Sequence, residues 1–192
     1  MTLTRAVTKP QTNELDFKVD TEVLVISEDW RGEIKKPSVF CSKIILEVCK
    51  LSRAKSEYKR GSHLEVSIVF ADDKFVKNLN MLYRNVNRPT NVLAFPNSDP
   101  QNPQCVNDVK HKLLGDIVVS FETIKKESSE ANKPFIDHVA HMVAHGMLHL
   151  LGFDHDNNKN ATEMETLEIE ILRKLGFPLN LEKEKNNDRE KY

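Results

Sequence analysis

Five of the 7 histidines of this chain lie between His138 and His155, in a stretch that includes "HGMLHLLGFDH". Spacings of three, four and four place His138, His141, His145 and His149 on one face of a helix. Two imidazoles four residues apart rise about 6 Å along the axis and can converge on one ion. Three in succession span about 12 Å and cannot all form bonds of about 2.0 to 2.1 Å. A third ligand must therefore come from outside the helix.

His155 can supply that ligand. Gly152 can adopt the left-handed conformation that ends a helix and turns the chain back. This turn would bring His155 toward His145 and His149. Three neutral imidazoles leave a fourth position open, which is typical of a catalytic rather than a structural zinc site. The sequence therefore predicts one Zn²⁺ per chain, bound by His145, His149 and His155.

The two remaining histidines of the helix are not expected to be ligands. His141 could contact a substrate or be partly buried, and we expect either role before a fourth metal bond. His138, near the helix start, is expected to be structural or to face solvent.

The spacing matches the zinc-protease pattern H-E-x-x-H-x-x-G-x-x-H except at the second position, which is Gly146. That difference removes the general base and argues against peptide hydrolysis. RNA carries its own 2′-hydroxyl nucleophile, and a dication can offset charge on its phosphate. The site therefore suits RNA better than peptide, with the nucleophile open between the 2′-hydroxyl and water activated by the metal.

Apolar periodicity predicts the elements that position these residues. The predicted strands are residues 22–30, 63–72, 90–96 and 112–121, and the predicted helices are residues 36–55, 72–84, 122–132, 134–152 and 161–176. Asp72 or Asp73 should open the second helix, and Pro134 suits the first turn of the histidine helix. The pattern indicates a mixed sheet.

Composition bounds the remaining possibilities. With 192 residues and 39% hydrophobic content the chain should form one domain, and its net charge of -1 excludes a uniformly basic nucleic-acid coat. The 3 cysteines predict no disulfide framework, and Cys41 and Cys49 fit buried thiols in an apolar helix. No apolar run is long enough to span a membrane, which predicts a soluble cytoplasmic protein.

With "YRNVNRPTNVLAFP", "LLGDIVVS" and "HMVAHGMLHLLGFDH", the chain resembles the endoribonuclease YbeY family of bacterial rRNA maturation factors. The likeness covers about residues 20 to 178. It implies that His145, His149 and His155 are the zinc ligands and that Arg84 contacts RNA phosphate. A guanidinium fork suits that role, because it binds two phosphate oxygens at once. Asp154 fits the family pattern and could orient a ligand, help activate water or tie down the turn.

Two positions depart from the usual motif of this family. Asn87 stands where the family often has Asp, and Ala94 stands where it often has Ser. These differences bear on substrate contacts in that loop and leave the metal ligands unaffected.

These observations predict a soluble α+β domain, with a mixed sheet flanked by helices and a metal site on the long helix and the turn after it. Residues 1–19 are expected to be a disordered leader, 20–178 the domain and 179–192 a polar tail. The expected function is that of a zinc-dependent single-strand endoribonuclease in ribosomal RNA maturation and ribosome quality control. Its expected partners are single-stranded or ribosomal RNA, the small ribosomal subunit and assembly factors.

Two rival functions stay open. One is a metal hydrolase acting on peptides or small esters, and the other is a non-catalytic ribosome-assembly factor that uses zinc only for stability. A basic rim around the metal could be formed by Lys55, Lys59, Arg60, Arg84, Arg88, Lys110 and Lys112.

Overall fold

Strand β3 (His63–Ala71) lies at the centre of the sheet, and its alternating apolar residues explain why. Leu64, Val66, Ile68 and Phe70 all project to one face and are almost fully buried. In the part of the chain that the structure describes, the sheet has the order β1-β2-β3-β5-β4. The bounds are Thr4–Val7 for β1, Lys18–Val25 for β2, Val92–Pro96 for β4 and His111–Ser120 for β5.

This sheet is mixed. β2 and β5 run parallel to β3, whereas β1 and β4 are antiparallel to their neighbours at the two edges. Gly115 allows β4 to approach β5, because a Cβ atom there would collide with the backbone oxygen of Phe95. The predicted α+β fold with a mixed sheet flanked by helices is confirmed.

The computed structural model describes residues 4–7, 17–52, 54, 58, 61–97 and 111–177. The expectation of a disordered leader over residues 1–19 is wrong where β1 forms and where β2 begins. A strand of four residues has too little apolar alternation to stand out in the sequence, and it forms here by backbone pairing with β2. The expected tail at 179–192 lies outside the described residues.

The predicted strand 22–30 also ends earlier than expected, because β2 stops at Val25 and Glu28–Trp30 form the short 3-10 helix η1. Trp30 explains the change. Its indole nitrogen donates to the backbone oxygen of Ala71 at 2.9 Å, and its ring packs edge-on against Phe70. Burying this side chain requires the backbone to turn inward.

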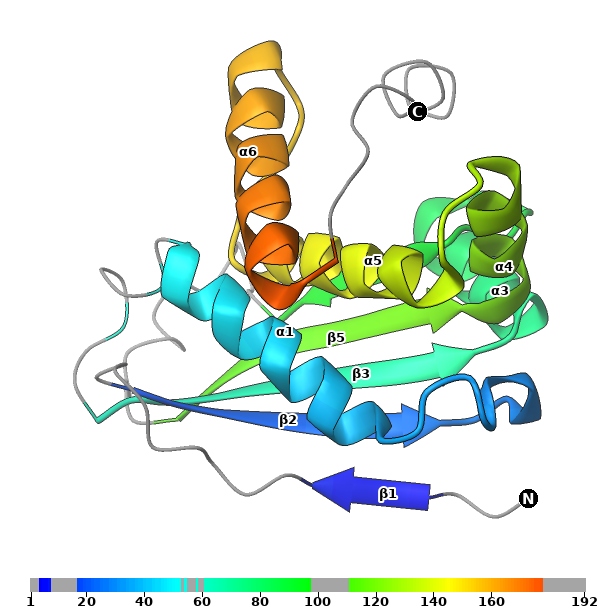
Figure 1. The fold of residues 1–192 in the computed structure, drawn as a ribbon, viewed down its shortest axis with the longest axis horizontal. Coiled ribbons are helices and arrows are strands. Elements are labelled where there is room, and N and C mark those ends of the chain that lie inside the picture. Colours follow the sequence, from blue (N-terminus) through cyan, green and yellow to red (C-terminus); the bar gives the residue numbers. More distant parts are fainter. Residues whose placement is uncertain are drawn as a thin grey trace.

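One face of the sheet is covered by helices, as Figure 1 shows. The helices on this side are α1 (Pro37–Leu51), α5 (Phe135–Leu150) and α6 (Asn158–Leu175). Ile44, Ile45 and Val48 of α1 join the main core with the buried thiols Cys41 and Cys49. Burial raises the pKa of both thiols, so they are inert packing residues as predicted.

A smaller cluster on the opposite face holds α3 (Asp73–Arg84) in place. Val76 of α3 packs there with Leu93 of β4 and Val118 of β5. Asp72 caps the helix by accepting from the Phe75 amide at 2.7 Å, as predicted. Asp73 accepts from Ser120 Oγ at 2.5 Å, which anchors the start of α3 to the end of β5.

Helix α4 (Phe121–Glu130) connects β5 to the histidine helix. The predicted helices 36–55, 72–84, 122–132, 134–152 and 161–176 thus correspond to α1, α3, α4, α5 and α6. No helix within the described ranges is long and apolar enough to cross a membrane.

Candidate metal centre

The candidate ligands are positioned by the second half of α5 and the turn after it. α5 lies directly on the sheet, and Gly146 makes this close contact possible. A Cβ atom at position 146 would lie 2.8 Å from Ile117 Cγ2 of β5 and 3.4 Å from Val92 Cγ2 of β4. Position 146 therefore faces the core, which is a packing reason for the absence of the protease glutamate.

Gly152 ends α5 in the left-handed conformation, with φ +83°, as predicted. The Phe153 amide donates to the Leu148 oxygen at 3.1 Å, and the Gly152 amide donates to the His149 oxygen at 3.0 Å. This arrangement is typical of a glycine-terminated helix. It reverses the chain and places His155 beside α5.

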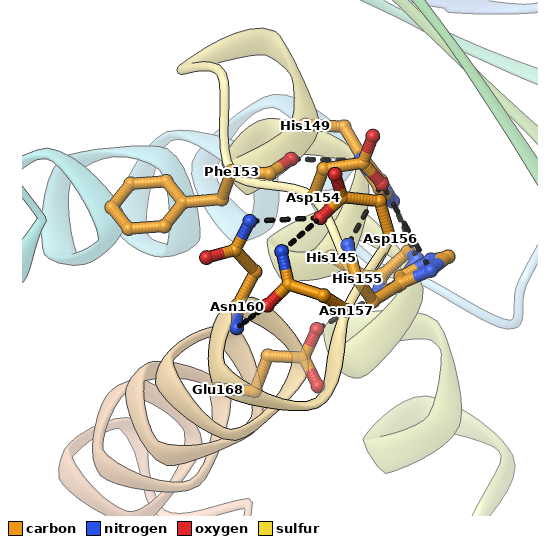
Figure 2. A network of polar contacts seen from close by, with 9 residues as sticks. All are labelled: His145, His149, Phe153, Asp154, His155, Asp156, Asn157, Asn160 and Glu168. Carbon is orange, nitrogen blue, oxygen red and sulfur yellow. Dashed lines mark hydrogen bonds and ion pairs between the residues drawn. The ribbon is translucent and has the colours of Figure 1, made fainter.

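The structure brings together His145, His149 and His155 (Figure 2). One ring nitrogen from each histidine lies within 4.8 Å of the others. The His155 ring is centred 5.8 Å from that of His145 and 5.2 Å from that of His149. His149 Nε2 and His145 Nε2 are 3.0 Å apart.

The hydrogen-bond partners of these rings decide which nitrogen carries the proton. Nδ1 of His149 is 3.0 Å from the Phe153 backbone oxygen, which can only accept, so Nδ1 holds the proton. Nδ1 of His145 is 2.7 Å from Glu168 Oε1, and it donates in the same way if the carboxylate is ionised. With Nδ1 engaged in each ring, the two Nε2 atoms face each other.

The ionisation of these groups supports this assignment. Burial alone would raise the pKa of Glu168, but its contacts with His141 and His145 outweigh burial and hold the pKa well below its usual value. Burial, with His145 and His155 nearby, lowers the pKa of His149 to about 4. At neutral pH, Glu168 is therefore a carboxylate and His149 a neutral imidazole.

The Nε2 atoms of His145 and His149 are 3.0 Å apart, close to the spacing that a shared ion requires. Two nitrogen ligands on one tetrahedral ion, each about 2.0 to 2.1 Å from it, are about 3.3 Å apart. The two rings need to open by only a few tenths of an ångström to reach that geometry. The donor set therefore fits a zinc ion, with His155 as a third nitrogen and a fourth position left for another ligand.

Glu168 of α6 was not anticipated from the sequence. It accepts from His145 Nδ1 at 2.7 Å (Figure 2). It also accepts from His141 Nε2 at 3.0 Å, and it is 7% exposed. A signal was present, because position 168 lies four residues after Met164 and three before Ile171 in the apolar stripe of this helix. An acid within an apolar stripe is costly to bury unless it is paired.

His141 and His138 have structural partners, as expected for histidines outside the ligand set. His141 is 9% exposed and bonds to Glu168, which makes it the partly buried helix residue among the predicted alternatives. His138 Nε2 lies 2.9 Å from Glu127 Oε2, which also accepts from Asn91 Nδ2 at 3.0 Å. These bonds join α5 to α4 and to the residue before β4.

Asp154 ties down the turn, which is one of the three roles considered. Its Oδ1 accepts from the His155 amide at 2.8 Å, and its side chain is largely exposed. The same oxygen is 3.9 Å from His155 Nδ1. Asp154 thus fixes the backbone that carries the third ring.

Arg84 is the last residue of α3, and its side chain is exposed. The segment after Arg84 is held by buried Asn80, whose Nδ2 donates to the Arg88 backbone oxygen at 2.8 Å. The structure describes no bond from Arg84 to the three histidines in the part of the chain that it covers, so its phosphate role stays a prediction. Asn87 is exposed in the same loop, and Ala94 packs against the main core.

The predicted basic rim is only partly described. Lys112 Nζ donates to Tyr58 Oη at 3.2 Å, near the start of β5. Lys55, Lys59, Arg60 and Lys110 lie outside the described residues. The structure therefore does not test a continuous rim.

The fold and the site together define an α+β protein with a three-histidine centre at a helix end and the following turn. The family model described as Endoribonuclease YbeY matches residues 25–176. The chain therefore belongs to the endoribonuclease YbeY family.

Curated relatives agree with this assignment. An Endoribonuclease YbeY from Methylocella silvestris is 42% identical over 156 residues, covering 81% of this chain and 82% of the relative. One from Bradyrhizobium diazoefficiens is 38% identical over 158 residues and covers 82% of each chain. The solution structure of TM1509 from Thermotoga maritima aligns with a TM-score of 0.48 at 21% identity, covering 90% of this chain and 96% of that one.

Proposed function

We propose that this protein is a zinc-dependent endoribonuclease that cuts single-stranded RNA during ribosomal RNA maturation and ribosome quality control. Its partners would be RNA and the small ribosomal subunit with its assembly factors, in the cytoplasm. The observation that carries the proposal is the convergence of His145, His149 and His155, with one ring nitrogen from each within 4.8 Å of the others. The family membership supplies RNA as the substrate.

Each of the three histidines has a defined part in this proposal. Glu168 and the Phe153 oxygen hold the rings of His145 and His149 with Nε2 directed inward, and the Asp154-bound turn presents His155. Three neutral nitrogen ligands with an open fourth position suit catalytic zinc. When bound, the ion would supply a Lewis acid that offsets charge on a phosphate and lowers the pKa of water.

Arg84 would bind the phosphate that flanks the scissile bond. Its guanidinium can donate to two phosphate oxygens at once and stabilise the charge that accumulates there. The neighbouring Tyr83 is 65% exposed, and its ring lies 5.0 Å from that of Phe95. An exposed aromatic ring beside a cation is the combination that many proteins use to hold single-stranded nucleic acid.

We infer that the 2′-hydroxyl of the RNA is the nucleophile. The 2′-hydroxyl would lose its proton to solvent as its oxygen attacks the adjacent phosphorus. The bond from phosphorus to the 5′-oxygen would break, and that oxygen would take up a proton from solvent. The products would end in a 2′,3′-cyclic phosphate and a 5′-hydroxyl. This route needs no carboxylate beside His145, which agrees with the position of Gly146 against Ile117.

The same packing weighs against the rival peptide hydrolase. A glutamate side chain at position 146 would start only 2.8 Å from Ile117 Cγ2, so it would enter the core and displace the side chains of Ile117 and Val92. The other rival is an assembly factor in which zinc only stabilises the junction of α5 and α6. The two proposals differ in whether RNA is cut.

The test is cleavage of a single-stranded ribosomal RNA fragment by the wild type and by His149→Ala. We expect cleavage that chelation abolishes and zinc restores, with His149→Ala inactive and a duplex of the same sequence left uncut. A folded, zinc-loaded wild type that binds the RNA without cutting it would support the non-catalytic factor instead.

A second substrate tests the nucleophile. A single 2′-deoxy nucleotide at the cut site should block the reaction at that position, and products from the unmodified RNA should carry the cyclic phosphate. Efficient cutting at the deoxy position would show that water is the nucleophile, with the histidine centre unaffected.

A further inference from the structure

A second group of metal-binding residue types lies at the start of β3 and β5. His63 and His111 are direct neighbours in the parallel register of these strands, and their rings are centred 4.6 Å apart. Glu65 follows on β3, with Oε1 3.9 Å from His111 Nδ1. One ring nitrogen of each histidine and one Glu65 oxygen lie within 4.8 Å of one another.

This group lies on the opposite face of the sheet from the helices that carry the first metal centre. Leu64 and Val66 of β3 project into the main core beneath α1 and α5. Because side chains alternate along a strand, His63 and Glu65 project to the other face. The two groups therefore cannot share an ion.

Asp20 of β2 orients His63. Its Oδ2 is 2.6 Å from His63 Nε2, so Nε2 donates to this carboxylate and Nδ1 is the ring nitrogen that can serve as a metal ligand. A carboxylate that accepts from one ring nitrogen while the other binds metal is a recurring arrangement in metalloproteins. The second Asp20 oxygen, Oδ1, is buried without a hydrogen-bond partner among the described residues.

The local charge also favours a dication. Lys18 Nζ lies 3.0 Å from Asp20 Oδ2 and 3.4 Å from His63 Nε2, and it contributes one positive charge. Burial alone would raise the pKa of Asp20, but Lys18 and His63 lower it, so the carboxylate is ionised at neutral pH. Asp20 and Glu65 together outweigh the charge of Lys18.

Binding an ion would require only exposed side chains of this group to move. His111 and Glu65 have side chains 70% and 50% exposed, so small rotations are not resisted by packing. Ligand atoms on one tetrahedral ion are about 3.3 Å apart, and the group has to contract by roughly 1.5 Å at most. His63, held by Asp20, would be the fixed point of the site.

We propose that His63, Glu65 and His111 form a second, exchangeable site for a transition-metal dication such as Zn²⁺, with Asp20 as the positioning residue for His63. Two imidazoles and a carboxylate are ligands that zinc accepts, with water completing the coordination. A bound ion would link the start of β3 to the start of β5. It would therefore raise the thermal stability of the protein by an amount that grows with the Zn²⁺ concentration.

The test is metal content after equilibrium dialysis against Zn²⁺, followed by elemental analysis. We expect two ions per chain in the wild type, one in His63→Ala/His111→Ala, one in His149→Ala and none in the combined variant. Asp116→Asn, an exposed change on β5, is the control and should keep two. His111→Ala alone should also lose the second ion. Because the His111 side chain is exposed, this change should not affect folding, so a loss of metal would reflect a lost ligand.

Each outcome separates this proposal from the function proposed for the first centre. Two ions in the His63→Ala/His111→Ala variant, or a single wild-type ion that only His149→Ala removes, would overturn the second site. A single wild-type ion that only the His63→Ala/His111→Ala variant removes would support the second site and contradict the first.

The role of Asp20 has its own measurement. In the His149→Ala background, Asp20→Asn should weaken Zn²⁺ binding about 10- to 100-fold in competition with a chromophoric chelator. The same change in a chain with both sites should leave the affinity of the first site unaltered. Equal affinities with and without Asp20 would show that it does not position His63.

Discussion

Glu168 Oε1 and His145 Nδ1 are 2.7 Å apart, and this bond joins the last helix of the domain to a ring of the metal centre. We expect Glu168→Gln to reduce zinc affinity about 10- to 100-fold, because the amide holds the donor proton of His145 less strongly than a carboxylate does. Competition with a chelator measures the change. Glu165→Gln, exposed on the same helix, is the control. An unchanged zinc affinity in Glu168→Gln would show that Glu168 does not support His145 as a ligand.

Removing one ligand should abolish tight zinc binding. We expect His155→Ala, like His145→Ala and His149→Ala, to lose zinc sharply at one equivalent of metal in the presence of a competing chelator. His138→Ala should keep it, since His138 bonds to Glu127 at 2.9 Å instead. Equal loss in all four variants would contradict the ligand assignment.

Arg84→Ala should separate catalysis from folding. The side chain is exposed, so we expect zinc content and thermal midpoint to be unchanged while RNA cleavage falls by about 100-fold or more. Arg84→Lys should recover only part of the rate, because an ammonium lacks the bidentate fork. Arg88→Ala, in the same exposed segment, should have a smaller effect. Loss of metal or unfolding in Arg84→Ala would make the residue structural.

Gly146→Ala should destabilise the protein, although alanine normally favours a helix over glycine. The added Cβ would lie 2.8 Å from Ile117 Cγ2, and such overpacking costs about 1 to 3 kcal/mol. The helix propensity of alanine returns up to about 1 kcal/mol. Urea denaturation should show a net loss of about 1 kcal/mol. A more stable variant would show that the side chains facing position 146 shift at little cost. The larger Gly146→Glu should unfold rather than gain peptidase activity.

The metal-free protein should lose stability as the pH falls from about 6.5 toward about 4. The pKa of His149 is lowered by burial, so over this range the unfolded chain binds more protons than the folded one. The stability is present at higher pH and is lost as the pH falls. His149→Gln should flatten this dependence in denaturation curves recorded with chelator. An equal dependence of stability on pH in both proteins would contradict the lowered pKa of His149.

Much of the fold follows from local patterns. Leu64, Val66, Ile68 and Phe70 indicate β3 by alternation alone, and Gly152 marks the end of α5 through its left-handed conformation. The His145, His149 and His155 spacing also identifies the candidate ligands, because helix geometry fixes where the rings can converge.

Other features depend on contacts that the sequence does not encode locally. β1 forms through backbone pairing, which any residues of suitable shape could provide. Trp30 turns the chain after β2 because of an acceptor on Ala71, far along the sequence. Glu168 and Asp20 become orienting partners only once α6 and β2 are in place. The position of Arg84 relative to the histidines likewise depends on tertiary packing.

The turn at Gly152 also affects the order in which the protein can fold. His145 and Glu168 are separated by only 23 positions, and the other two rings lie between them. The pairing of His63 with His111, by contrast, requires distant strands to meet in parallel. Contacts close in sequence form sooner because closing a short loop costs less entropy. We therefore expect α5 and α6, with the histidines between them, to pack together before the strands of the sheet pair. A metal ion could then bind to a chain that is still folding.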